Sequence, residues 1–159
     1  MSFSFGDGQS VILGDFSRLE KLIAGLKEKH FVDIGVFGSA VTPEGQSVAE
    51  YGAYNEFGSI TKPDHPPKRS FIRMPLTKRQ AKIEAYVKKN MQEHIEKGDI
   101  KAIFEDIGIA GESVIQEAFD TRGFGSWKEN ADRTVAAKGS DAPLINDGTL
   151  RHAVTHRTE

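Results

Sequence analysis

Apolar residues recur at helical spacing in four stretches of this chain, and in a fifth stretch they alternate with polar residues. The first two helical patterns predict a helix over residues 17–29 and a shorter one over residues 47–57. Each begins with a capping box, in which a serine and a glutamate three residues later bond free backbone N–H groups. Between these helices, residues 31–37 follow a period of two, which predicts a half-buried strand.

The other two helical patterns are longer and predict helices over residues 75–97 and 99–119. The glycine and the aspartate between them are typical of a helix stop and a helix cap. Within the second long helix, Gly108 and Gly111 interrupt the apolar pattern. Because glycine is unfavourable in a helix interior, this pair predicts a close helix–helix approach or a kink.

Prolines and weaker patterns mark the remaining segments. Residues 59–70 contain three prolines and are predicted to form a loop, followed by a brief extended piece over residues 71–74. After residue 120 the periodicity weakens, and residues 131–137 predict one or two helical turns. Residues 149–156 are compatible with a helical turn, a strand, or both.

Together these patterns predict one domain over residues 1–159 with a mixed α+β fold. We expect a small, mostly antiparallel sheet packed against the two long helices, with an extended loop and extended termini. Residues 1–14 are expected to form a loose arm or a short edge strand. Residues 59–70 would be a proline-rich docking loop, and residues 155–159 a mobile tail.

Composition narrows the functional classes. The chain of 159 residues has no cysteine, which excludes disulfides, thiolate nucleophiles and cysteine-based zinc sites. No run approaches the ~18 apolar residues of a membrane helix, and the N-terminus lacks a secretory signal pattern, so we expect a soluble protein made in the cytoplasm. The net charge of −2, from 21 basic and 23 acidic residues, does not support a protein whose main task is gripping nucleic acid.

Histidine and carboxylate patterns give little support for catalysis or metal binding. His152 and His156 would meet on one helix face, as two metal ligands can, but the glutamate that a metalloprotease motif needs after the first histidine is missing. His65 lies beside Asp64 on the proline-rich loop, without a nucleophile-elbow, phosphate-loop or dinucleotide motif elsewhere. We therefore predict a non-enzymatic protein with no catalytic, cofactor-binding or metal-binding residue and no cofactor. The histidine pair would lie in an exposed basic tail.

A basic stretch between residues 62 and 82 is more informative, because it contains seven positively charged residues and only one negatively charged residue, an aspartate. Two of them, Lys78 and Arg79, would fall in the first turn of the predicted 75–97 helix, where positive charge opposes the helix dipole. Apolar residues are interleaved among the charges, as on a loop that docks onto a partner. The positive residues are Lys62, Lys68, Arg69, Arg73, Lys78, Arg79 and Lys82.

The 47–57 helix carries two tyrosines and a phenylalanine, which are typical either of a core stripe or of a contact surface. The basic stretch is likewise compatible with an interface or with an ordinary solvated surface. We predict a partner interface formed by Tyr51, Tyr54, Phe57, Lys68, Arg69, Phe71, Arg73 and Arg151.

The order of the segments carries a family resemblance. Residues 32–36 (VDIGV) precede 49–58 (AEYGAYNEFG) and 67–73 (PKRSFIR), and a second block combines 127–130 (WKEN) with 143–154 (PLINDGTLRHAV). This succession resembles the tail-completion or neck proteins of long-tailed bacteriophages and prophages, including virion-morphogenesis relatives in Mu-like phages. The resemblance covers most of residues 31–155. Asn146-Asp147 and Ala153 depart from it, since the family has Asp-Thr and Ser at these places.

The resemblance implies a ring-forming virion component at the head–tail junction, with no catalytic residues to transfer. It implies a homo-oligomeric ring that contacts the tail terminator, the tail tube and the connector or neck proteins, assembled in the host bacterial cytoplasm and without a membrane partner. Another neck role (collar, connector or tail terminator) is an alternative. So is a DNA-contacting channel module that uses the basic 62–82 stretch, or a small hydrolase that uses His65 or His152.

Overall fold

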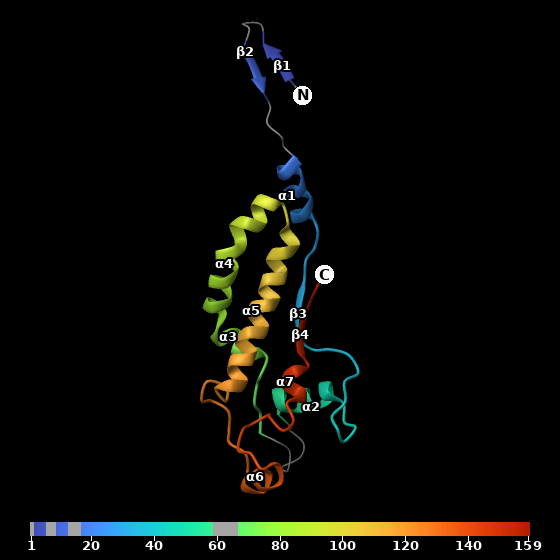
Figure 1. The fold of residues 1–159 in the computed structure, drawn as a ribbon, viewed down its shortest axis with the longest axis vertical. Helices are drawn as coiled ribbons and strands as arrows, with labels where there is room; N and C mark the ends of the chain where they lie inside the picture. Colours follow the sequence, from blue (N-terminus) through green and yellow to red (C-terminus); the bar gives the residue numbers. More distant parts are fainter. Residues whose placement is uncertain (1, 6–8, 13–16, 59–66) are drawn as a thin grey trace.

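The computed structural model describes residues 2–5, 9–12, 17–58 and 67–159. In Figure 1 the helices α4 and α5 and the strands β3 and β4 run along one elongated body, while α2, α6 and α7 gather at its lower end. The predicted α+β class, with a small antiparallel sheet packed against two long helices, is confirmed. The elements are β1 (Ser2–Phe5), β2 (Gln9–Ile12), α1 (Ser17–Lys27), β3 (Val32–Val36), α2 (Val48–Phe57), α3 (Arg73–Lys78), α4 (Gln80–Lys97), α5 (Ile100–Asp120), α6 (Asp132–Lys138), α7 (Thr149–His152) and β4 (Val154–Thr158).

The body is built from a helical hairpin and a two-stranded sheet. α4 and α5 are joined by Gly98, which has a left-handed conformation, and by Asp99, whose side chain accepts a hydrogen bond from the backbone N–H of Ala102 at 3.0 Å. The predicted stop and cap are therefore confirmed. β3 and β4 pair antiparallel, and both strands contact α5. The sheet thus joins an early segment of the chain to its last residues.

The C-terminal segment is ordered, so the expectation of a mobile tail over residues 155–159 is wrong. β4 pairs with β3 from Val36 opposite Val154 to Val32 opposite Thr158. Phe31 and Glu159 then exchange two backbone hydrogen bonds of 2.9 and 3.1 Å. This segment forms its backbone hydrogen bonds with a strand that lies 118 to 126 positions earlier in the chain, which no local pattern reveals.

The two glycines of α5 let the sheet, not another helix, approach closely. A Cβ atom at Gly108 would lie 2.1 Å from Cδ2 of His156 on β4, and one at Gly111 would lie 2.3 Å from Cδ1 of Ile34 on β3. Real Cβ atoms do not come this close to other atoms, so a side chain at Gly108 would displace the His156 ring and one at Gly111 would displace the end of the Ile34 side chain. The glycine pair does mark a close approach, but here α5 meets the sheet and not another helix, as had been expected.

The main core lies where the lower end of α5 meets α2, α7 and the loops. Phe119 packs between Phe71 and Trp127, with ring centroids 5.7 and 5.6 Å apart. Trp127 and Leu144 are buried and Ile145 is half-buried. The buried cluster consists of Val48, Phe71, Ile115, Ala118, Phe119, Trp127, Leu144, Leu150 and Val154. Three aromatic rings at this point anchor segments from three parts of the chain.

The long helix predicted over residues 75–97 is two helices. α3 begins at Arg73, where an extended piece was expected, and Arg79 interrupts the helix with φ −111° and ψ 18° before α4 starts. Lys78 therefore lies in the last turn of α3, where a positive charge interacts favourably with the negative end of the helix dipole. The unfavourable placement inferred from sequence for Lys78 is wrong.

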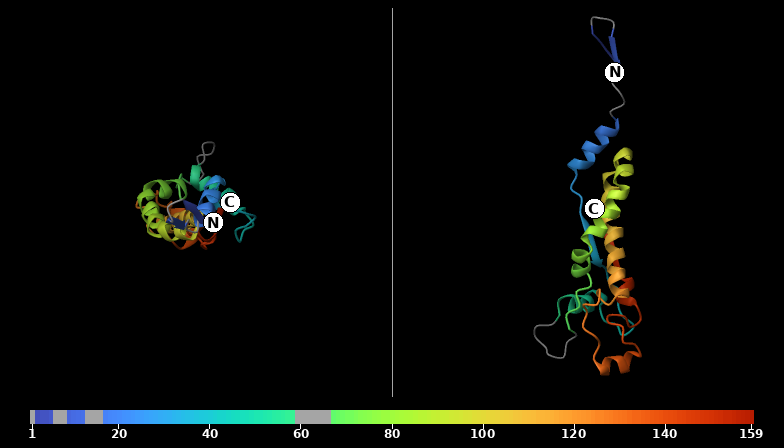
Figure 2. Two further views of the ribbon diagram at one scale, coloured as in Figure 1. Left: turned by 90° about the horizontal axis from the view of Figure 1, so that it is seen from above. Right: turned by 90° about the vertical axis from the view of Figure 1, so that its left-hand side faces the viewer.

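The N-terminal part differs from the loose arm or edge strand expected for residues 1–14. β1 and β2 pair with each other, with Ser2 opposite Ile12 and Phe5 opposite Gln9. This hairpin lies beyond the outer end of α1, and α1 itself lies beside the α4–α5 turn (Figure 2). The apolar stripe of α1 is largely uncovered, with Leu26 71% exposed.

Candidate functional site

The two sequence blocks that carry the resemblance meet at the lower end of the molecule. Residues 69–73, at the end of the first block, are held by Glu56 of α2 on one side and by residues 127–130 of the second block on the other. We call residues 69–73 the clamped segment. Its contacts are mostly hydrogen bonds to backbone atoms, so they fix the path of the chain.

Glu56 is the first clamp. Its Oε2 accepts hydrogen bonds from the backbone N–H groups of Phe71 at 2.6 Å and Ile72 at 2.9 Å. Its Oε1 accepts from the Ser70 hydroxyl at 2.7 Å and from the Arg73 guanidinium Nε at 2.9 Å. Burial alone would raise the pKa of this carboxyl, but these hydrogen bonds together outweigh it and lower the pKa. The carboxylate thus satisfies the free N–H groups at the start of α3.

Arg69 is the second clamp, and it faces the opposite way. Its Nε donates to the backbone carbonyl of Lys128 at 2.7 Å, and its Nη2 donates to the carbonyl of Glu129 at 2.9 Å and to Oδ1 of Asn130 at 3.2 Å. Trp127 adds a hydrogen bond from its indole N–H to the carbonyl of Ser70 at 3.2 Å. Arg69 is only 5% exposed.

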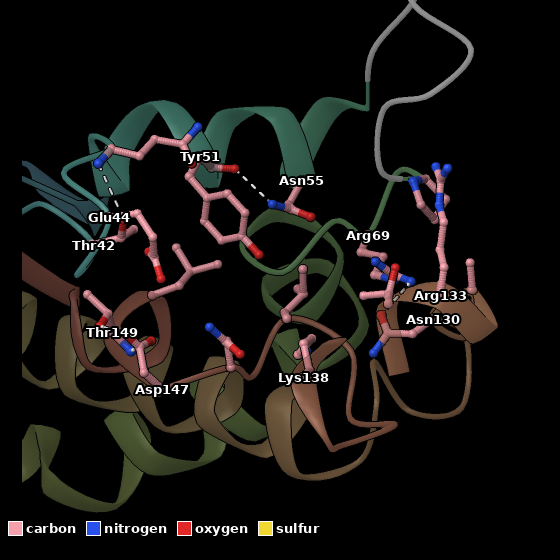
Figure 3. Close-up of a pocket in the computed structure, with 17 residues that line it drawn as sticks. Thr42, Glu44, Tyr51, Asn55, Arg69, Asn130, Arg133, Lys138, Asp147 and Thr149 are labelled. Carbon is pink, nitrogen blue, oxygen red and sulfur yellow. Dashed lines mark hydrogen bonds between the residues drawn. The ribbon is translucent and has the colours of Figure 1, made fainter. Parts of the chain in front are cut away.

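A cleft of about 420 Å³ opens beside this joint, between α2, α6 and the loop before α7. Figure 3 shows Arg69, Arg133 and Lys138 on one side of it and Glu44 and Asp147 on the other. We call it the α2–α6 cleft. Its walls come from segments that are distant in sequence, so the fold must form before the cleft exists.

The side chain of Tyr51 lies between the two walls of the α2–α6 cleft (Figure 3). Burial raises the pKa of its hydroxyl, so this group is a neutral hydrogen-bonding partner at physiological pH. Sequence reasoning selected Tyr51 but missed Arg133, Lys138 and Glu44. Nothing local marks these three, because their proximity depends on long-range folding.

The predicted interface residues divide into two groups. Tyr54, Phe57 and Lys68 are exposed, and the Arg73 guanidinium stacks over the Phe57 ring at 4.4 Å while its side chain stays 55% exposed. Parts of all four side chains therefore lie at the surface of the molecule. Tyr51 is half-buried in the cleft wall.

The other predicted interface residues serve the fold. Phe71 is fully buried and Arg69 nearly so, which makes the expectation that they lie on a docking surface wrong. Arg151 is half-buried, donates to Oε1 of Gln116 at 2.7 Å and pairs with Asp120 at 2.7 Å. Charge suggested exposure for Arg69, but its acceptors are carbonyl groups some 60 residues along the chain, which sequence reasoning could not see.

Part of the basic stretch is paired with carboxylates within the chain, including Arg73 with Glu56. Arg79 and Lys82 both pair with Glu117, at 2.8 and 2.7 Å, and Lys78 donates to the Ser126 hydroxyl at 2.7 Å. Lys62, like the rest of residues 59–66 of the expected docking loop, lies outside the described residues. Among residues 67–82, three of the six positive side chains are thus held by carboxylates of the chain itself, which weakens the case for DNA contact.

His156 is not part of an exposed tail. Its Nδ1 lies 2.7 Å from Oε1 of Glu112 and its Nε2 lies 2.9 Å from Oε1 of Glu105, both on α5. Burial disfavours the charged imidazolium, but the two glutamates outweigh it and raise the pKa of His156. His152 is exposed and His65 lies outside the described residues. No group of three metal-ligating side chains occurs in the part of the chain that the structure describes.

A second, mainly apolar hollow of about 230 Å³ lies between α2, the end of β3 and the clamped segment. Ala49, Ala53 and Phe57 line it from α2, and Ile72 lines it from the clamped segment. Phe57 is 59% exposed at its edge. Exposed aromatic surface of this kind is enriched in protein interfaces.

Comparison of the chain with family models, with curated proteins and with solved structures found no match to any of the three. Among the described helices, none has both the length and the apolar character needed to cross a membrane.

Proposed function

We propose that this protein is a structural subunit of the head–tail junction of a long-tailed bacteriophage, a tail-completion or neck component that forms a ring and joins the tail to the connector. The proposal places it in the virion, in contact with the tail terminator and tail tube. Other neck roles (collar, connector or terminator) share the same chemistry and are the nearest alternatives.

The observation that carries the proposal is the convergence of the two sequence blocks that resemble that family. Glu56 and Arg69 belong to the first block and Trp127 to the second, and contacts of all three hold the clamped segment in place. Their contacts are structural, with backbone atoms as partners, as expected of a scaffold that positions surfaces. This agreement supports treating the blocks as parts of one fold.

Exposed side chains around this scaffold support an assembly role. Tyr54 and Phe57 lie on the outer face of α2, and the stripe of α1 is largely uncovered. Two such surfaces at different places on one chain suit a heterologous contact, in which one copy binds the next through unlike faces. A closing rotation between copies then gives a ring.

Deletion of the gene in the phage or prophage that encodes this chain tests the role. We expect filled heads and complete tails that remain separate in electron micrographs, and joined particles when the wild-type gene is supplied from a plasmid. Joined, infectious particles produced by the deletion strain would refute the proposal. Electron microscopy and light scattering of the purified full chain, alone and with the tail terminator, test ring formation separately.

A further inference from the structure

The cationic wall of the α2–α6 cleft lacks a negative partner. Arg69 donates to three neutral oxygens, and Lys138 donates to the backbone carbonyl of Ala142 at 2.9 Å. Within residues 17–58 and 67–159, no ion pair involves Arg69, Arg133 or Lys138. Buried charges in proteins are normally paired, so an unpaired, nearly buried guanidinium beside an ammonium group is unusual.

The electrostatics of the wall agree with this geometry. Burial lowers the pKa of Arg69, since a charged group loses hydration there. Burial, and then repulsion from Arg69, lowers the pKa of Lys138. An anion in the cleft would relieve both effects, because it would supply the missing negative charge.

The opposite wall carries two carboxylates, Asp147 and Glu44, which differ in their hydrogen bonding. Both carboxylate oxygens of Asp147 are engaged by Thr149, one by its backbone N–H at 2.9 Å and the other by its hydroxyl at 2.7 Å. Glu44 is exposed and lies across the cleft from the cations (Figure 3). The α2–α6 cleft is therefore dipolar, positive at α6 and negative at Glu44.

We propose that the α2–α6 cleft binds an acidic segment of a neighbouring polypeptide. The carboxylate of that segment lies against Arg133 and Lys138, with Arg69 adding positive charge behind them, while a cationic or amide group of the same segment faces Glu44. Guanidinium and ammonium groups are the usual partners of carboxylates in proteins. The hydroxyl of Tyr51 provides a neutral hydrogen-bonding group between the two walls. The identity of the neighbour as a virion subunit rests on the proposed function. The chemistry of the cleft is independent of that function.

A nucleic acid fits this cleft less well than a peptide. A DNA strand presents a continuous row of phosphates, and Glu44 and Asp147 would repel the phosphates next to the one bound at the cations. A peptide can alternate charges at the spacing of its side chains. The dipolar walls therefore favour a polypeptide.

Nuclear magnetic resonance of the full chain gives a direct test. The Nε–H group of Arg69 is buried and hydrogen-bonded, so its signal reports on the cationic wall. The probes are the blocked tripeptide acetyl-Glu-Ala-Lys-amide, its acetyl-Gln-Ala-Lys-amide counterpart and a 20-base-pair DNA duplex. We expect a saturable shift with the first peptide at a dissociation constant of about 1 mM, the range for a short ligand held by a few charged contacts. The glutamine peptide should bind at least about tenfold more weakly.

Variants separate the cleft from general electrostatics. Arg133→Gln and Lys138→Gln should each weaken binding of the glutamate peptide by about fivefold or more. Lys89→Gln removes the same charge from an exposed side chain of α4, outside the cleft, and should leave binding unchanged. Equal weakening in all three variants, or no saturable shift with the glutamate peptide, would overturn the proposal. Tighter binding of the duplex that depends on Arg133 and Lys138 would overturn it in favour of DNA.

The same variants distinguish failure of this inference from failure of the proposed function. If the gene deletion separates heads from tails but the Arg133→Gln/Lys138→Gln double variant restores joining fully, the junction role stands and the cleft is not its docking site. If the deletion leaves particles joined while the peptide still binds as expected, the cleft stands and the junction role fails.

Discussion

Replacing Glu56 by glutamine tests whether the clamped segment depends on a single buried carboxylate. The side chain of Glu56 is 5% exposed and its two oxygens accept five hydrogen bonds, two at Oε2 and three at Oε1. Glutamine has the same shape but only one acceptor oxygen. Its NH₂ group must face at least two of the donors that the carboxylate satisfied.

The magnitude follows from which donors are lost. If the glutamine oxygen stays at the Oε1 position, the N–H groups of Phe71 and Ile72 each face another donor. A buried donor left without a partner costs about 1–3 kcal/mol. Removing the negative charge also weakens the contact with Arg73, although solvent screens a side chain that is 55% exposed. We therefore expect the free energy of unfolding to fall by about 3–5 kcal/mol, as for other broken buried pairs.

Urea unfolding and calorimetry of the purified chain measure this loss. For a chain of this size, 1 kcal/mol corresponds to about 2–4 °C in melting temperature, so Glu56→Gln should lower it by roughly 6–20 °C. Glu50→Gln is the matched control, because Glu50 is an exposed residue of the same helix, and its carboxylate accepts from the Tyr54 hydroxyl at 3.3 Å. A melting temperature for Glu56→Gln within error of Glu50→Gln would refute the reasoning.

The pH dependence gives a second, independent check. Since the folded-state pKa of Glu56 is lowered, its stabilisation is present above the ordinary value of 4.5 and is lost as the pH falls through the folded pKa. The difference in unfolding free energy between wild type and Glu56→Gln should therefore be constant near neutral pH and shrink in acid. A difference that stays constant down to pH values below the folded pKa would show that the carboxylate charge is not responsible.

Three further predictions follow from other contacts. His156→Gln should lower the free energy of unfolding more at low pH than at high pH, as measured by urea unfolding at a series of pH values. Because the pKa of His156 is raised in the folded state, its stabilisation is complete below pH 6.5 and is lost as the pH rises through the folded pKa. Gly108→Ala should cost about 1–3 kcal/mol in unfolding free energy through overpacking against the His156 ring, whereas Ser113→Ala, at an exposed position of the same helix, should cost little. Phe57→Ser should lower phage titre by about tenfold or more with little change in melting temperature, and an equal loss of stability would assign Phe57 to the fold.

Elements that are specified by nearby residues could be predicted from the sequence. Ser47 accepts from the backbone N–H of Glu50 at 3.3 Å, as its capping box predicts, and Gly98 and Asp99 end and begin helices as expected. The strand at residues 32–36 follows its period-two pattern. In each case the signal and the structure that it predicts lie within a few residues of each other.

The misplaced boundaries have long-range causes. α3 begins before Pro75 because Glu56, 17 residues earlier than Arg73, satisfies the N–H groups at its start. Pro75 then lies in the first turn of the helix, where its missing N–H costs nothing. Likewise, β4 exists because Val32–Val36 is available to pair with it. Local patterns show neither partner.

The candidate site was predicted only in part for the same reason. Arg69 was expected at a docking surface because it belongs to the basic 62–82 stretch, yet its guanidinium is buried against the backbone carbonyl groups of Lys128 and Glu129. Lys138 and Glu44 were missed because their positions on opposite walls of one cleft require three separate segments to be folded. Exposed residues such as Phe57 were found because an aromatic side chain on a short helix is visible locally.

The distribution of charge in this structure separates what the family-like blocks do from what a partner would recognise. Glu56, Arg69 and Trp127 are buried and bind the chain's own backbone, so a resemblance carried by them is first of all a resemblance in fold. A partner can contact only what this scaffold leaves exposed, such as Phe57 at the end of α2 and Arg133 in the α2–α6 cleft. Substitutions in the blocks should therefore reduce stability and assembly together, while substitutions of the exposed residues should reduce assembly alone. If peptide binding or head–tail joining is lost only in variants whose melting temperature also falls, this division is wrong. That result would place recognition in the buried blocks.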